Sequence, residues 1–155
     1  MSINAEYINP FLEAATVVFK SILKVDLRRG KLIIKDNPIP SMDVAIIIGI
    51  TGGVIAGEIV YSMSFPMVEK IAEVLIPGLT EEQIKSEYKD IVGELANMIT
   101  GNAMNLFAST GKFIDITTPT VIEGKDFNAT MLKQTTLGIT LFCTMGQLEM
   151  NIALK

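Results

Sequence analysis

The sequence predicts an α/β (α+β) domain of two layers, in which long helices cover a mostly antiparallel sheet. The order of the predicted elements, which is helix, strands, helices and strands, is typical of such a layered domain. The chain has 155 residues, of which 49% are apolar and 19% charged. This length and composition suit one folded domain with a sizeable core, so we expect a single domain over residues 1–155.

Two long helices and one short helix are predicted from apolar residues that recur three and four positions apart. The first long helix is expected over about residues 5–24. The second is expected over about 80–109, where a Thr-x-x-Gln pattern at its start forms a capping box. A shorter helix should follow Ser64, a typical N-cap residue, and should stop at Pro77-Gly78.

The remaining apolar segments are short and rich in β-branched residues, which predicts strands. Thr51-Gly-Gly is expected to form a tight hairpin between the second and third of them. The strands are predicted near residues 31–35, 44–50, 54–63, 115–123, 133–144 and 147–154.

An internal correspondence lies in two of these strand pairs. Ile48-Gly-Ile-Thr51 is followed by Gly57-Glu-Ile59, and Leu137-Gly-Ile-Thr140 is followed by Gly146-Gln-Leu148, with the same offset of 89 residues. Chance similarity between two β-rich segments is one interpretation. The other is a duplicated helix-plus-strands unit with a pseudo-two-fold axis, which would make the two long helices counterparts.

Composition excludes several classes of function. The formal net charge is −4, and the basic residues do not cluster beyond Arg28-Arg29, so we expect no nucleic-acid partner. The chain contains no histidine, which excludes Ser-His-Asp and Cys-His triads, His-ligated metal sites and a phosphohistidine carrier. Cys143 is the single cysteine, so no intramolecular disulfide can form, and we expect a buried strand thiol there.

A membrane location is not expected either, although the mean hydropathy is +0.43. The longest uncharged run, residues 44–57, is interrupted by glycines and is shorter than the roughly 20 residues of a spanning helix. The first residues show neither the basic nor the apolar region of a signal peptide. We therefore expect a cytoplasmic protein.

The second long helix carries a polar stripe. At about 100° per residue, Asp90, Glu94, Asn97 and Gly101 share a narrow sector of one face. The small Gly93 and Gly101 beside the carboxylate and the amide would leave room for the backbone of a partner. Periodicity alone favours an ordinary solvated face.

The spacing Asp90-x-x-x-Glu94-x-x-Asn97, with Pro119 after twenty-one intervening residues, resembles the motif of the CheC–CheX–FliY chemotaxis phosphatases. Three local strings resemble the CheX branch in particular. They are Ile48-Gly-Ile-Thr-Gly-Gly53, Gly93-Glu-Leu-Ala-Asn-Met98 and Asp115-Ile-Thr-Thr-Pro-Thr-Val121. The distance to the proline is one residue shorter than the pattern usually written for CheC.

The resemblance implies a phosphatase that dephosphorylates the aspartyl-phosphate of a CheY-like response-regulator receiver domain. Glu94 would pair with the lysine of the receiver, Asn97 would hold the attacking water, and Asp90 would support the docking surface. No cofactor or metal would be bound by this chain, because the receiver supplies Mg²⁺. The resemblance also implies a homodimer paired through sheet strands, and the apolar segments 44–50 and 137–154 are candidates for that interface.

The first long helix offers Asn9-x-x-x-Glu13-x-x-Thr16 at the same spacing as the motif. A hydroxyl at Thr16 is shorter than an amide, so we interpret this helix as a decayed copy and expect one active site per chain. Two alternatives stay open. The chain could be a non-catalytic adaptor that binds a receiver, or a structural protein whose strands serve dimerisation only.

Overall fold

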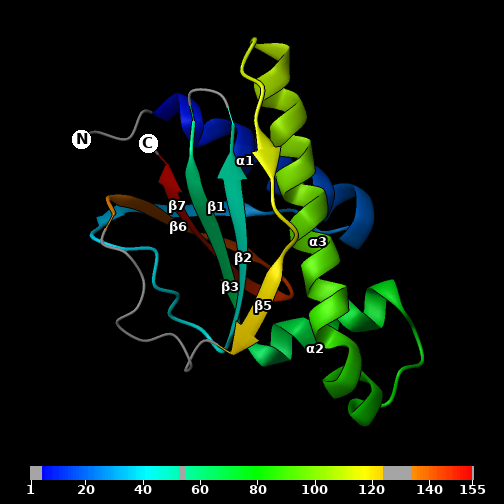
Figure 1. The fold of residues 1–155 in the computed structure, drawn as a ribbon. Coiled ribbons are helices and arrows are strands. Elements are labelled where there is room, and N and C mark those ends of the chain that lie inside the picture. Colours follow the sequence, from blue (N-terminus) through cyan, green and yellow to red (C-terminus); the bar gives the residue numbers. More distant parts are fainter. Residues whose placement is uncertain (1–4, 53–54, 124–133, 155) are drawn as a thin grey trace.

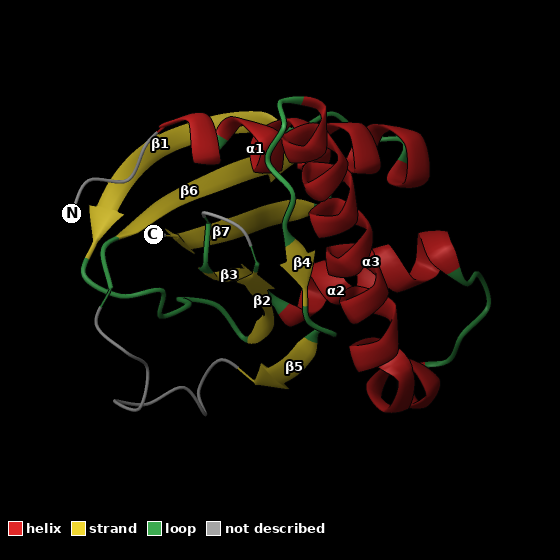
Figure 2. Cartoon of the chain, turned by 45° about the horizontal axis from the view of Figure 1, so that its top comes forward, coloured by secondary structure: helices red, strands yellow, loops and turns green. Residues whose placement is uncertain are grey.

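Helices cover one side of a curved antiparallel sheet in the computed structural model, which describes residues 5–52, 55–123 and 134–154 (Figures 1 and 2). The first long helix consists of a 3₁₀ turn (Ala5–Tyr7), α1 (Asn9–Val18) and a π-helical turn (Phe19–Leu23). The others are α2 (Phe65–Leu75) and α3 (Glu81–Ser109).

The starts of α2 and α3 are confirmed as predicted, because local side chains satisfy the first free N–H groups. The Ser64 hydroxyl accepts from Met67 N at 3.3 Å. The Thr80 hydroxyl accepts from Gln83 N at 3.2 Å, and the Gln83 side chain accepts from Thr80 N at 2.8 Å. The short helix stops at Leu75, just before Pro77-Gly78, and the long one stops at Ser109.

The strands of the described residues are β1 (Arg28–Lys35), β2 (Val44–Thr51), β3 (Gly57–Met63), β4 (Asp115–Ile116), β5 (Thr120–Glu123), β6 (Thr136–Cys143) and β7 (Gly146–Leu154). These strands form one sheet in the order β1-β6-β7-β3-β2-β4, with β5 also paired to β2, and every pairing is antiparallel.

Two predictions about the strands need correction. The predicted strand over 115–123 is split into β4 and β5. The expected tight hairpin at Thr51-Gly-Gly is longer than predicted, because β3 begins only at Gly57. Gly53 lies outside the described residues.

The sheet has a pseudo-two-fold arrangement. A rotation about the paired residues Tyr61 and Met150 exchanges β3 with β7, β2 with β6, and the β4–β5 segment with β1. Gly57 and Gly146, which the 89-residue offset relates, begin β3 and β7 with φ of 147° and 141°. The two long helices are counterparts in this arrangement and pack together, with the Phe11 and Phe107 rings edge to face at 5.7 Å.

The correspondence fails in the other strand of each pair. Gly49 pairs with Glu58, and the counterpart of Glu58 in β7 is Gln147. Gly138 would therefore pair with Gln147 if it were equivalent to Gly49. It pairs instead with Asn151, four residues further along β7. The hairpin between β6 and β7 is tight, whereas five residues connect β2 to β3. The strands β2 and β6 are therefore counterparts, but the likeness of Ile48–Thr51 to Leu137–Thr140 does not mark equivalent positions.

The two segments proposed for a subunit interface are central in the sheet. The strand β2 is paired on both sides, β6 lies between β1 and β7, and β7 lies between β6 and β3, so none of them offers a free edge. Three exposed apolar side chains lie instead on the edge strand β1, at Leu32, Ile33 and Ile34. Among the described residues, no helix is long and apolar enough to cross a membrane.

Candidate active site on an exposed helix face

The polar stripe of α3 faces outward over the middle of this 29-residue helix. Asp90 and Glu94 are exposed, Asn97 is half-buried, and Gly101 is half-buried with open space where a side chain would stand. The opposite side is apolar and packs into the core between helices and sheet. Its buried residues include Ile84, Tyr88, Ile91, Val92, Leu95, Ala96, Ile99, Ala103 and Phe107.

A buried hydrogen-bond chain ties α3 to the centre of the sheet next to Asn97. The Thr100 hydroxyl donates to Ala96 O at 2.7 Å, so it accepts from the Tyr61 hydroxyl, 2.8 Å away. Tyr61 is fully buried, and burial raises the pKa of its hydroxyl, which therefore stays protonated as a donor. Because buried polar groups must be paired, this chain fixes both the position and the rotation of the helix.

Gly93 does not have the role predicted from the sequence. It is buried, and a side-chain carbon at this position would lie 3.4 Å from Val121 Cγ2 and 3.6 Å from Pro119 Cγ. The space beside it is taken by the β4–β5 segment of the same chain, so it cannot admit the backbone of a partner. Gly101 retains the open space that the prediction requires.

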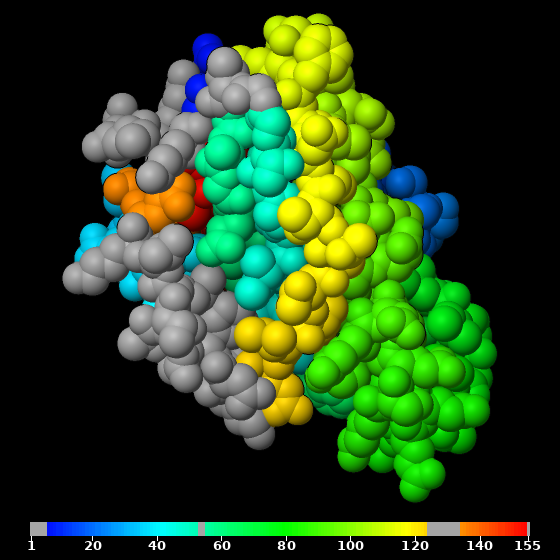
Figure 3. Space-filling view, in the orientation of Figure 1, coloured from blue at the N-terminus to red at the C-terminus, as the bar shows by residue number. Residues whose placement is uncertain are grey.

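Pro119 lies in a bulge between β4 and β5. Ile116 pairs with Ile50 and Thr120 pairs with Ile47, so three residues on the edge segment stand opposite two on β2. Proline suits such a break because it has no N–H to give to a ladder. Figure 3 shows the β4–β5 segment, in yellow, as a strip between β2 and α3.

Thr117 joins this bulge to β2. Its hydroxyl accepts from Gly49 N at 2.8 Å, and its own N–H donates to Gly49 O at 2.9 Å. The hydroxyl also donates to Thr118 O at 3.2 Å. The strands approach so closely here that a side-chain carbon on Gly49 would lie 2.9 Å from Thr117 Cγ2.

The stripe offers an unengaged carboxylate and an unengaged amide one helical turn apart. Within the described part of the chain, the side chains of Asp90, Glu94 and Asn97 make no hydrogen bond or ion pair. A carboxylate can accept from a cationic donor, and an amide can both donate to and accept from a water molecule. The same part of the chain contains no cluster of three or more side chains suited to hold a metal ion. These groups are therefore available to interact with a partner.

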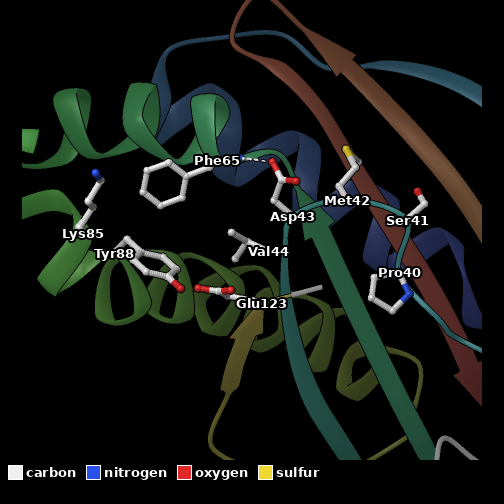
Figure 4. A pocket seen from close by; sticks show the side chains of 9 residues that line it. All are labelled: Pro40, Ser41, Met42, Asp43, Val44, Phe65, Lys85, Tyr88 and Glu123. Atoms are coloured by element: carbon white, nitrogen blue, oxygen red, sulfur yellow. Dashed lines mark hydrogen bonds between the residues drawn. The ribbon is translucent and has the colours of Figure 1, made fainter. Parts of the chain in front are cut away.

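An open groove of about 700 Å³ lies elsewhere on the surface, between α2, α3 and the start of β2 (Figure 4). Asp43 accepts from Phe65 N at 3.1 Å there, and the Phe65 and Tyr88 rings meet edge to face at 5.4 Å. Figure 4 shows the Tyr88 side chain directed toward Glu123. Neither Glu94 nor Asn97 lines this groove, so the candidate site is separate from it.

The first long helix carries its version of the motif on α1. Asn9, Glu13 and Thr16 are all exposed. The Thr16 hydroxyl donates to Leu12 O at 2.8 Å within the helix, so it is turned back to its own backbone. That α1 is a structural copy without a site stays a prediction.

Thr117, Gly49 and the bulge were not predicted from the sequence as parts of the site. The signal was present, because the three strings that carried the resemblance meet at this place. Gly49 lies in the first string, Gly93 in the second, and Thr117 and Pro119 in the third. Sequence alone could not show that these segments touch.

Comparisons with known proteins identify the family of the chain. Residues 44–143 match the family described as chemotaxis phosphatase CheX. The CheY-P phosphatase CheX of Thermotoga maritima is 31% identical over 124 residues, which cover 79% of each chain. A crystal structure of a CheC-like superfamily protein from Shewanella sp. PV-4 is similar with a TM-score of 0.85 and 28% identity, covering 99% of both chains. The CheX–CheY–BeF₃–Mg²⁺ complex of Borrelia burgdorferi is similar with a TM-score of 0.77 and 25% identity, covering 96% of this chain and 97% of that chain.

Proposed function

The chain belongs to the family of the chemotaxis phosphatase CheX, and we propose that it hydrolyses the aspartyl-phosphate of a CheY-like receiver domain. The observation that carries the proposal is the outward-facing pair of Glu94 and Asn97 on α3, which have no partner within the described chain. A relative with 31% identity is a CheY-P phosphatase, and a similar structure was solved in complex with CheY, which supports the partner.

In the proposed reaction, a water molecule attacks the phosphorus as the bond to the aspartate oxygen breaks. The products are inorganic phosphate and the free carboxylate. Phosphoryl transfer passes through a loose transition state, so catalysis consists mainly of positioning and electrostatic stabilisation. Asn97 orients the water with its amide, which can hold the water without removing its proton early.

Glu94 has the docking role in this proposal. Its exposed carboxylate accepts from the lysine of the receiver in a charge-assisted hydrogen bond. Asp90, one turn earlier, extends the negative docking face, and Gly101 leaves room for the backbone of the receiver. Mg²⁺ belongs to the receiver, as the composition of the Borrelia burgdorferi complex also suggests. The reaction would take place in the cytoplasm, with one site per chain.

The substitution Asn97→Ala tests the mechanism. It should leave the affinity for a receiver nearly unchanged, because the amide acts on the transition state and not on docking. By analogy with the loss of an oxyanion-hole donor, kcat should fall on the order of 10²-fold or more. The measurement is phosphate release from a phosphorylated receiver, with binding followed separately. Near-normal turnover would exclude the mechanism and favour an adaptor that only binds.

We also propose a homodimer, formed through the edge strand β1. Among the described strands, β1 pairs with β6 alone, and its apolar side chains at Leu32, Ile33 and Ile34 are 48%, 48% and 77% exposed. An edge strand with apolar side chains is a ready template for pairing with another strand. A second copy would continue the sheet and cover these residues, as the homodimers expected for this family do.

A further inference from the structure

We infer that Thr117, together with Gly49, is a positioning element for the hydrolytic site, because their contact seats Pro119 against α3 beside Glu94 and Asn97. The inference deepens the proposed function and rests on it. Neither residue lies on the docking stripe of α3. Both act through the edge segment that borders it.

The hydrogen bonds between Gly49 and Thr117 differ from those of a regular antiparallel ladder. In a regular antiparallel pair, both backbone groups of Gly49 would bond to backbone groups of the facing residue. Here the N–H of Gly49 bonds to the Thr117 hydroxyl instead, at 2.8 Å. That hydroxyl in turn donates a hydrogen bond to Thr118 O. The side chain of Thr117 therefore replaces a ladder partner at the point where the bulge interrupts the ladder.

Gly49 and Thr117 also lie unusually close to each other. A methyl group on Gly49 would come within 2.9 Å of Thr117 Cγ2, which is closer than packed carbon atoms come in proteins. Only glycine lets the bulge lie this near β2. The depth of the bulge thus depends on both residues of the pair.

Pro119 connects the bulge to the candidate site on α3. Two residues after Thr117, the Pro119 ring packs over Gly93, where a side-chain carbon would lie 3.6 Å from it. Gly93 immediately precedes Glu94, and Asn97 follows one turn later on the same helix. A shift of the bulge therefore reaches the stretch of helix that holds the water-orienting amide. Misplacement by about 1 Å at a reacting group can cost up to about 10²-fold in rate.

Thr117→Val keeps the shape of the side chain but removes the hydroxyl, and Gly49→Ala wedges the strands apart. Each should lower kcat about tenfold. The affinity for the receiver should stay within about twofold, because the docking stripe is intact. The assay uses a CheY-like receiver that the unmodified chain dephosphorylates, with kcat and dissociation constant measured separately.

Three further variants distinguish positioning from general destabilisation. Thr117→Ser retains the hydroxyl and should restore kcat. The double variant Gly49→Ala with Thr117→Ser removes the methyl group that clashes and should recover much of the loss from Gly49→Ala alone, a coupling that independent sites would not show. Thr120→Val removes an exposed hydroxyl from β5 without changing the bulge and should leave kcat unchanged.

Loss of affinity in parallel with kcat, or full turnover by a folded Thr117→Val variant, would overturn the inference. So would equal losses from Thr117→Ser and Thr117→Val. Failure of the proposed function has a different signature. In that case Asn97→Ala would also keep full turnover, or no variant would act on a receiver at all.

Discussion

At the scale of single residues, the two long helices carry the same spacing but different chemistry. Glu94 and Asn97 are unengaged on α3, whereas the Thr16 hydroxyl on α1 is bonded to Leu12 O. With its hydrogen engaged, the shorter Thr16 hydroxyl can only accept from a water, whereas the Asn97 amide can both donate and accept. In the proposed mechanism, this difference between an amide and a hydroxyl makes α3, and not α1, the helix that performs the reaction.

Glu94→Ala and Glu13→Ala form a matched pair for this asymmetry. Loss of Glu94 should weaken receiver affinity and turnover by at least about tenfold, because it removes the partner of a lysine charge. Loss of Glu13, an equally exposed carboxylate on α1, should leave the rate within about twofold. Titration of both variants with one receiver measures the two effects. Equal losses would mean that both helices are active.

Glu58 on β3 gives a pH-dependent prediction for stability. It is half-buried, and burial raises the pKa of its carboxyl, so the folded state holds this proton more tightly than the unfolded state. This tighter proton binding stabilises the folded state at low pH. The stabilisation is lost as the pH rises from the pKa of an unfolded glutamate, about 4.3, through the raised pKa of Glu58 in the folded state. Glu58→Gln should therefore raise the free energy of unfolding at pH 7.

The gain from Glu58→Gln should disappear below about pH 4, where glutamate is uncharged in both states. Urea unfolding at several pH values measures it, with the exposed Glu13→Gln as control. A gain that is the same at pH 3 and pH 7 would contradict burial as its cause.

At the scale of elements, α3 has two glycines on different sides. Gly93 is covered by Pro119 and Val121, and Gly101 faces open space. Alanine is favoured over glycine in a helix by up to about 1 kcal/mol, so each Gly→Ala change should stabilise α3 where the new methyl fits. The contacts of 3.4 Å and more around Gly93 allow such a fit.

The pair Gly93→Ala and Gly101→Ala then separates folding from docking. Both variants should be at least as stable as the parent in thermal unfolding. Only Gly101→Ala should weaken receiver affinity, because its methyl group would occupy the space proposed for the backbone of the receiver. Unchanged affinity in Gly101→Ala would place the docking surface elsewhere on α3.

The helices were predictable because their signals are local. Ser64 and the Thr80–Gln83 box define starts from neighbouring residues, and periodicity separates the buried from the exposed side of α3. The bulge was not predictable, because its register depends on β2, which lies far away in sequence. Periodicity also could not show that Gly93, at the border of the stripe, is covered by another segment. The helical residues of the site were therefore found, and its neighbours were missed.

At the scale of the whole molecule, the free edge of β1 is the feature that predicts association. Ile34→Lys places a charge on the most exposed of its apolar residues, where it would oppose pairing with a second copy. The variant should be monomeric and folded, whereas the parent should be dimeric. Sedimentation or light scattering measures this difference, with Val74→Lys on α2, another exposed apolar position, as control. A variant that remains dimeric would exclude β1 as the interface.

The palindromic order of the sheet also determines how the chain can fold. Each half gives its first strand to the other half, since β1 pairs with β6 while β4 and β5 pair with β2. Arg28 therefore meets Phe142, and such distant pairings cost loop-closure entropy before they return any stability. Neither half contains a complete sheet of its own. A cut between them would take an edge strand from both at once, and we expect the two halves to be stable only when they fold together.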